Sequence, residues 1–510
     1  MAGPSSTGST IDISSNKSVK KLQGKAVGLV GVLFLAVTGA APMSAMLGNV
    51  PFAAGYGIGT YAPAAFLLAT IVLTIFSVGY AAMASRVSSV GGFYSFISQG
   101  LGREIGMSAG FTSLASYSLF EASLSGLFAF FGNKWLNDHF GIDVPWLVLA
   151  LIMIALIALL SYRDVKLSVR VLGTALVAEV IILVIFVIGV ALAKSGTSYS
   201  LESLNLFKVY TPLAAQTVGT VAIPAGAAAV GVFMAFWSWV GFEMAPNYAE
   251  ESRDPKKTIP QSLLISVIGL GVFYIIVSWS AVSAFPTQAD MAAKAYSDGV
   301  NFFLTPIQGF VGNWAFELMF LLILTSSFAC GMAFHNTTAR YIYSLGREGV
   351  LPKMVAQTHD DYKSPHKASL VQSILAAAWV ILYGLGYGFD DPSGQAWLGV
   401  YTLFAVLGTG LLLVLQAVVS VAIILWFRKN GGGNIFTTLI APAISVVVQV
   451  WLVYTLIANL ATLGGTNGFA TSIPFVGLGI ILVGLVWGIV LKRVNPVGYG
   501  NIGHMVNDEA

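Results

Sequence analysis

Uncharged apolar runs of about 20 residues recur along the chain, separated by short stretches that carry Lys, Arg, Gly, Pro or Asn. A helix of this length matches the hydrocarbon core of a bilayer, about 30 Å thick. The pattern predicts twelve spans, at residues 25–52, 60–85, 102–131, 145–162, 167–194, 224–249, 258–285, 314–345, 368–388, 397–428, 435–461 and 473–491. An even number of spans places both termini on one side of the membrane.

Two of these spans are interrupted. The first contains Thr38 to Pro42, where the missing proline amide should unwind the helix, although a simple proline kink is the alternative. The sixth has Gly241 before Glu243 and Pro246 after it. The first and sixth spans are equivalent members of two five-span halves, and such interruptions indicate a transporter binding site between inverted repeats.

Composition supports this interpretation. The chain has 510 residues, of which 56% are hydrophobic and 9% are charged, against about 25% charged in soluble domains. We therefore expect an all-α integral membrane protein. Residues 1–24 are predicted to form a disordered cytoplasmic tail, without the features of a signal peptide. Residues 492–510 are predicted to form a second cytoplasmic tail.

Basic residues are distributed unevenly between alternate loops. Twenty-one of the 25 Lys and Arg residues fall on the side of both termini, and only Lys134, Lys194, Lys208 and Lys294 fall on the other. By the positive-inside rule, both termini are cytoplasmic in a multi-pass protein of the cell (inner) membrane, in contact with lipid. The net charge of +3 gives no indication of a nucleic-acid partner.

Three carboxylates inside predicted spans are candidate functional groups. Placing a charged side chain near the centre of a bilayer costs about 2.5–3.5 kcal/mol, so such residues are rarely retained without a role. Glu243 lies in the interrupted sixth span, and Glu179 lies in an apolar fifth span, where a carboxyl is suited to carrying a proton. Glu121 lies in the third span. The alternative for Glu121 is an internal hydrogen bond to a Ser or Asn of the bundle, and the alternative for Glu179 is a structural hydrogen bond. His335 is interpreted as a packing residue.

Motifs for other classes of protein are missing from the sequence. It shows no metal-ligand cluster, phosphate-binding glycine loop or nucleophile constellation, so we expect neither an enzyme nor an ATP-driven pump, and no metal or cofactor. A channel would repeat pore-lining segments, which this chain does not do.

The motifs together resemble the amino acid–polyamine–organocation (APC) superfamily, and within it the bacterial amino acid permeases. The residues that carry the resemblance are Thr38 to Pro42, Gly91 to Tyr94, Phe236 to Glu243, residues 250–260, and His335 to Gly349. The resemblance implies a leucine-transporter-like fold with alternating access, in which a 5+5 inverted-repeat core spans residues 25–430 and two peripheral helices span 431–491. It implies secondary active transport of an amino acid by a symporter or antiporter.

The resemblance also implies roles for individual residues. Substrate-binding residues would be Thr38, Gly39, Ala40, Ala41, Tyr117, Glu121, Phe236, Trp237, Trp239 and Val240. Trp237 would cover the substrate, and Glu179 and Glu243 would couple transport to a proton. Several relatives have a lysine where Glu179 stands, and Pro42 offers no amide to a carboxylate. Sodium coupling and an amine, polyamine or cationic amino acid substrate therefore stay open.

Overall fold

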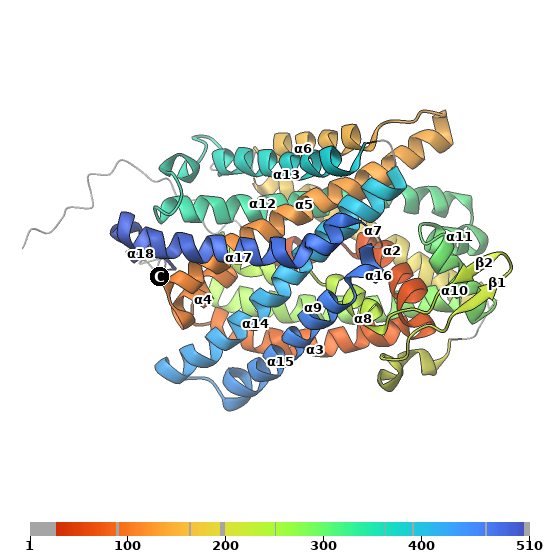
Figure 1. Cartoon of the computed structure of the whole chain (residues 1–510), viewed down its shortest axis with the longest axis horizontal. Helices are drawn as coiled ribbons and strands as arrows, with labels where there is room; N and C mark the ends of the chain where they lie inside the picture. The colour runs from red at the N-terminus through yellow and green to blue at the C-terminus, as the bar shows by residue number, and fades with distance from the viewer. Residues whose placement is uncertain are drawn as a thin grey trace, which may run out of the picture.

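A computed structural model describes residues 27–87, 91–162, 165–193, 199–249, 251–362, 364–389, 392–464 and 467–503. The tail predicted at residues 1–24 and the last seven residues of the C-terminal tail lie outside these ranges. The described chain is a bundle of long helices whose axes run roughly along the longest dimension of the molecule (Figure 1).

The longer helices are α3 (Ala62–Ala84), α5 (Arg103–Phe140), α6 (Trp146–Ser161), α7 (Val165–Ala193), α9 (Pro255–Ser283), α12 (Asn313–Arg347), α13 (His366–Tyr387), α14 (Phe404–Asn430), α15 (Ala441–Ala458) and α17 (Gly468–Val494). The shorter α-helices are α1 (Leu29–Ala40), α2 (Pro42–Phe52), α4 (Gly92–Leu101), α8 (Ala228–Trp237), α10 (Gln288–Ser297), α11 (Asn301–Phe310), α16 (Leu460–Gly464) and α18 (Pro496–Asn501). Helix α5 packs against α4, α6, α12, α14 and α17.

Short π and 3₁₀ segments join these helices. They are η2 (Ala53–Ile58), η3 (Gly59–Tyr61), η4 (Leu201–Leu204), η5 (Leu206–Lys208), η6 (Phe242–Tyr248), η7 (Lys353–Ala356), η8 (Pro392–Leu403) and η9 (Phe436–Ile440). The strands β1 (Gln216–Val218) and β2 (Val221–Ile223) form one antiparallel hairpin.

The described helices confirm the predicted class of multi-pass helical membrane protein. Ten segments are long and apolar enough to cross a membrane, and Trp146–Ser161 is a shorter apolar helix. The 56-residue segment Leu29–Ala84 would be about 84 Å long as a single helix, far more than one crossing needs. It turns near Gly59, where φ is 60°, and is long enough for two spans. The exact number of twelve stays a prediction.

Structure between the predicted spans differs from the simple loops that hydropathy suggests. The hairpin lies in the loop after α7, and α10 and α11 occupy much of the loop after α9. The third predicted span ends at residue 131, but α5 continues to Phe140. Hydropathy detects only the apolar part of a helix, whereas backbone hydrogen bonding continues until Gly141 adopts a positive φ of 65°.

Both predicted interruptions are present. Helix α1 ends at Ala40 and α2 starts at Pro42, with Ala41 between them in the left-handed region at φ 43° and ψ 76°. Ala41 is the one non-glycine with a positive φ among the described residues. Helix α8 ends at Trp237, and η6 begins after Gly241, whose φ is 119°. The sequence therefore predicted both breaks correctly.

The two breaks lie against each other. A Cβ atom added to Gly241 would lie 2.3 Å from the carbonyl carbon of Gly39, and one added to Gly39 would lie 3.2 Å from Gly241 Cα. At Gly241 only glycine, which has no Cβ atom, lets the two backbones come this close. The backbones of the two interrupted helices are thus packed directly together, with no side chain between them.

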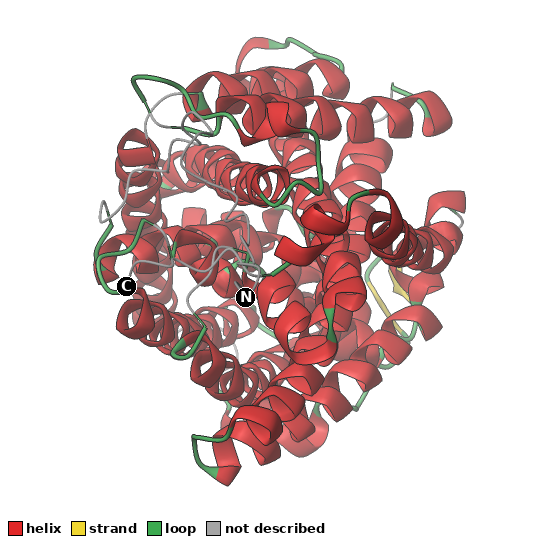
Figure 2. Ribbon diagram, turned by 90° about the vertical axis from the view of Figure 1, so that its left-hand side faces the viewer, coloured by secondary structure: helices red, strands yellow, loops and turns green. Residues whose placement is uncertain are grey.

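One end of the bundle, here called the terminal face, carries the first and last described residues. Val27 bridges to Ser252, and the carboxylate of Glu251 bonds to Arg340 Nη2 at 2.9 and 3.0 Å. Ile502 is buried at this face, close to α4. Figure 2 looks onto the terminal face, where many helices are seen end-on, and α10, α11 and the hairpin lie at the opposite end in Figure 1.

We predict that Gly241→Ala destabilises the protein by at least about 2 kcal/mol, because the new methyl group meets backbone and the positive φ is strained for alanine. Thermal unfolding of the purified protein in detergent measures the effect. Gly269→Ala is the control, since a Cβ there meets nothing within 4 Å and alanine favours a helix. Equal unfolding temperatures for the two variants would contradict the prediction.

Candidate functional site

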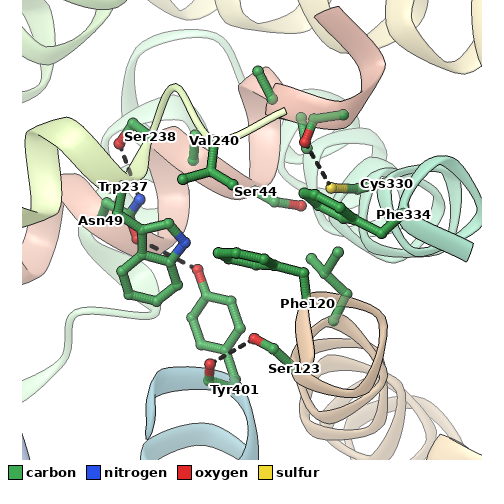
Figure 3. A pocket seen from close by; sticks show the side chains of 15 residues that line it. Ser44, Asn49, Phe120, Ser123, Trp237, Ser238, Val240, Cys330, Phe334 and Tyr401 are labelled. Atoms are coloured by element: carbon green, nitrogen blue, oxygen red, sulfur yellow. Dashed lines mark hydrogen bonds between the residues drawn. The ribbon is translucent and has the colours of Figure 1, made fainter. Parts of the chain in front are cut away.

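A small cavity of about 30 Å³, here called the pocket, lies beside the two helix breaks. It has room for only a water molecule or two, so a substrate of amino acid size fits only after the walls move apart. Fifteen residues from α1, α2, α5, α8, α12, η8 and the α1–α2 and α8–η6 junctions line it: Gly39, Ala40, Ala41, Ser44, Ala45, Asn49, Phe120, Ser123, Leu124, Trp237, Ser238, Val240, Cys330, Phe334 and Tyr401. Figure 3 shows these side chains converging on a common space.

The walls are aromatic and aliphatic, with a few hydroxyl and amide groups. Phe120 stacks on Phe334 with ring centroids 4.9 Å apart, and the Tyr401 ring lies 5.3 Å from that of Trp237. Among the described residues that line the pocket, none has a charged side chain. The pocket therefore suits a ligand without net charge and with an apolar part.

Polar side chains at the pocket are already hydrogen-bonded to one another. Asn49 Nδ2 donates to Ser238 Oγ at 2.9 Å, and Ser123 Oγ donates to the Tyr401 carbonyl at 2.6 Å. Cys330 Sγ donates to the Gly39 carbonyl at 3.1 Å. Figure 3 marks these contacts as dashed lines. They fix the orientation of the lining groups and hold η8 against α5 and α12 against α1.

Opposite helix ends meet at the pocket. Helix α2 begins at Pro42, next to the lining residues Ala41 and Ser44, so its positive dipole end is at the pocket. Helix α8 ends at the lining residue Trp237 and brings a negative dipole end. The pocket therefore offers partial positive charge on one side and partial negative charge on another.

The backbone amides at the first break are occupied in this structure. The Ala41 N–H bonds to the carbonyls of Val37 and Thr38, and Pro42 has no amide hydrogen. Beyond the break, the Met43 N–H donates to Glu179 Oε2 at 3.2 Å and the Ser44 N–H to Ser326 Oγ at 3.3 Å. The predicted contact of Gly39 to Ala41 with a substrate carboxylate stays a prediction.

Glu179 caps the start of α2 from α7. Its Oε2 also accepts a hydrogen bond from Ser326 Oγ at 2.9 Å, and Ser326 Oγ in turn accepts one from Ser44 Oγ at 3.0 Å. The carboxyl is 2% exposed. A carboxylate at a helix N-terminus is stabilised by the dipole, and Ser44 connects this network to the pocket.

Glu243 lies behind the second break and does not line the pocket. Its Oε2 accepts the Gly241 N–H at 2.9 Å, and its Oε1 accepts the Tyr117 hydroxyl at 3.1 Å. Both side chains are buried. Glu243 therefore holds the turn at Gly241 and joins it to α5.

Glu121 also points away from the pocket. Its carboxylate is hydrogen-bonded to His335 on α12 and accepts a hydrogen bond from Gln372 Nε2 on α13 at 2.6 Å. Glu121 has no exposed surface. Phe120 and Leu124 line the pocket from the same helix. Because successive residues turn by about 100°, Glu121 faces the side of α5 that packs on other helices. The alternative for Glu121 was a hydrogen bond inside the bundle to a Ser or Asn. Such an internal bond is present, but its partners are His335 and Gln372.

The predicted binding residues divide into two groups. Gly39, Ala40, Ala41, Trp237 and Val240 line the pocket.

The remaining predicted binding residues lie outside the pocket lining. Phe236 packs in the core near Trp239, whose Nε1 donates to the Val267 carbonyl at 3.2 Å. Thr38 is buried, and its hydroxyl has no hydrogen-bond partner among the described residues. Tyr117 and Glu121 are bonded elsewhere, as described above. Their predicted roles, like those of the lining residues, stay predictions.

Several lining residues were missed from the sequence. The sequence analysis did not single out Ser44, Asn49, Ser123, Ser238 or Tyr401. A polar residue in an apolar span was the available signal, but such residues also bond to their own helix, as Ser420 does. Only the packing of the helices distinguishes the two cases.

The comparisons with known proteins agree on one family. The sequence profile of the amino acid permease family matches residues 27–486. An uncharacterized transporter of Mycobacterium tuberculosis strain H37Rv is 24% identical over 434 residues, which cover 81% of this chain and 85% of the relative. The low-affinity putrescine importer PlaP of Escherichia coli K12 is 24% identical over 310 residues, 60% of this chain and 64% of PlaP. The branched-chain amino acid permease BcaP of Lactococcus lactis is 27% identical over 308 residues, 56% of this chain and 61% of BcaP.

Proposed function

Because this chain belongs to the amino acid permease family of the APC superfamily, a family of membrane transporters, we propose that it carries a neutral amino acid by alternating access. The pocket beside the two helix breaks is the proposed binding site. The protein is proposed to lie in the cytoplasmic membrane with both termini inside the cell, as the distribution of Lys and Arg predicts.

The observation that carries the proposal is the meeting of two opposite helix ends at an uncharged pocket. A neutral amino acid is a zwitterion, so its carboxylate matches the positive end of α2 and its ammonium group the negative end of α8. Ser44, Asn49 and Ser238 stand at these ends as hydrogen-bonding groups. Opposite partial charges compensate a zwitterion without leaving a net buried charge.

The aromatic walls indicate the kind of side chain. Phe120, Phe334 and Trp237 surround the pocket and favour an aliphatic or aromatic substituent. The name of BcaP, a permease for branched-chain amino acids, agrees with this reading. An amine, polyamine or cationic amino acid is the second candidate, because aromatic faces also hold ammonium groups and PlaP is named for putrescine.

Glu179 is the proposed site of the coupling proton. When ionised, it adds negative charge at the same helix end that the substrate carboxylate would approach. Protonation removes this repulsion while leaving one oxygen to accept the Met43 N–H. Binding of a zwitterion should therefore favour binding of a proton, which is the basis of symport. A sodium ion beside Glu179 would be the alternative coupling ion.

Uptake of labelled compounds into proteoliposomes tests the substrate class. We expect saturable uptake of L-leucine or a similar neutral amino acid, enhanced by an inward proton gradient. Excess unlabelled L-lysine and putrescine should compete at least about tenfold more weakly, because no carboxylate faces the pocket to offset a second ammonium group. Stronger competition by putrescine or lysine would establish the second candidate, and single-channel currents would indicate a channel.

We predict that Trp237→Ala raises the half-saturating substrate concentration about tenfold or more, because the indole forms one wall of the pocket. Concentration-dependent uptake measures this. Trp451→Ala, on α15 and outside the pocket lining, is the control and should change uptake less than about twofold. If the two variants behave alike, Trp237 contributes packing and not substrate contact.

We predict that Glu179→Gln flattens the pH dependence of uptake, because glutamine mimics the protonated side chain permanently and still accepts the Met43 N–H. Substrate binding should stay measurable. The readout is the initial uptake rate over a pH series, with unfolding temperature as the check on folding. An unchanged pH profile excludes Glu179 as the coupling group, and a requirement for sodium indicates cation coupling.

A further inference from the structure

An apolar groove lies on the outside of the bundle, between α5 and α17. It has a volume of about 350 Å³ and is lined only by apolar side chains, those of Phe111, Leu482, Val483, Val486 and Trp487. Val483 and Val486 are 60% and 55% exposed. Because α17 is long and apolar enough to cross a membrane, the groove opens toward lipid.

Close packing of α17 on α5 holds the walls of the groove in place. A Cβ atom added to Gly484 would lie 2.8 Å from Ser108 Cα, and one added to Gly488 would lie 3.1 Å from Glu104 Cα. Ser108 Oγ donates a hydrogen bond to the Ile481 carbonyl at 2.7 Å, one residue before the first groove residue of α17. The groove is therefore present in this structure without any movement of the helices.

Basic side chains stand at the end of the groove that lies toward the terminal face. Lys492 and Arg493 are exposed near the end of α17, and Arg103 is the first residue of α5. Lys492 pairs with Glu104 at 3.1 Å, whereas Arg103 and Arg493 form no ion pair within the described residues. Three cations against one carboxylate leave an excess of two positive charges at this end.

The helix period places one of these cations on the groove side of α17. Arg493 follows Leu482 by eleven residues and Val486 by seven, and both separations are within about 20° of a whole number of turns. Arg493 lies about 10 Å beyond Val486 along the axis. On the other side, the guanidinium carbon of Arg103 and the Lys492 Nζ lie 5.4 and 5.5 Å from the Tyr499 ring. The groove and the cations therefore form one continuous surface.

The geometry points to this surface as a binding site for an anionic phospholipid, with an acyl chain in the groove and the phosphate at Arg103 and Arg493. A guanidinium group suits a phosphate because it can donate two parallel hydrogen bonds. The distribution of Lys and Arg predicts that the terminal face is cytoplasmic, and the cytoplasmic leaflet carries anionic lipids. This inference concerns the membrane and goes beyond the proposed transport function.

A second copy of the chain fits this surface less well than a lipid does. Helices approach each other closely in membranes where small residues face the partner. The small residues beside the groove, Gly484 and Gly488, already face α5. The groove itself is lined by branched and aromatic side chains, and its volume admits a hydrocarbon chain but not a helix about 10 Å wide.

Native mass spectrometry of the purified full-length protein tests for the lipid. Phosphatidylglycerol should bind at least about fivefold more tightly than phosphatidylcholine with the same acyl chains, because only the first carries a net negative charge. Arg493→Gln should weaken phosphatidylglycerol binding about fivefold.

Arg428→Gln is the matched control for the head group. Arg428 is exposed near the end of α14, and no groove residue lies on that helix, so binding should change less than about twofold. Equal binding of the two lipids, or equal effects of the two arginine substitutions, would overturn the inference.

Val486→Trp tests the acyl chain, because an indole at this position would fill the groove. It should weaken phosphatidylglycerol binding at least about fivefold, with unfolding temperature as the check on folding. Val447→Trp is the control, since Val447 is 69% exposed on the apolar span of α15. Unchanged lipid binding in Val486→Trp, or loss of a dimer in place of the lipid, would contradict the proposed occupant.

Photolabelling locates the bound chain. Phosphatidylglycerol with a photoactivatable group in the middle of an acyl chain should label Phe111 or a peptide that contains residues 482–487. Labelling confined to other spans would overturn the inference. None of these measurements uses a substrate, so absence of leucine uptake would refute the proposed function and leave the lipid site to be decided by its own tests.

Discussion

The direct backbone contact between Gly39 and Gly241 is the constraint on which the rest of this structure depends. Any side chain at Gly241 would collide with the Gly39 backbone, so the two interrupted helices touch only because residue 241 is glycine. This contact fixes where α2 begins relative to where α8 ends, and so places opposite helix dipoles at one pocket. The broken helices would otherwise expose backbone groups that a membrane does not solvate.

Buried carboxylates stabilise this arrangement from outside the pocket. Glu243 accepts the Gly241 N–H and the Tyr117 hydroxyl, and Glu179 accepts the Met43 N–H at the start of α2. Each carboxylate therefore satisfies a donor that a helix break leaves without its usual partner. The acidic residues of the spans surround the pocket without entering it, which leaves a polar but uncharged lining.

In the proposed function, this separation of the acidic residues from the pocket lining lets a proton act on a binding site that itself carries no charge. Glu179 reaches the pocket wall through Ser326, which accepts a hydrogen bond from the lining residue Ser44. A change in the charge of Glu179 would alter the electrostatics at the start of α2. The substrate and the proton would then influence each other through the helices and not through direct contact.

The sequence by itself determined the class of membrane protein and both helix breaks, because these follow from hydropathy and from Pro42 and Gly241. The family followed from the resemblance of its motifs and the profile match. It could not decide which way a polar side chain in a span points. Glu121 and Phe120 are neighbours in the sequence, yet one bonds to His335 and the other lines the pocket. A rotation of about 100° per residue separates them, and only the packing of α5 against α12 and α13 shows which side is buried in protein and which faces the pocket.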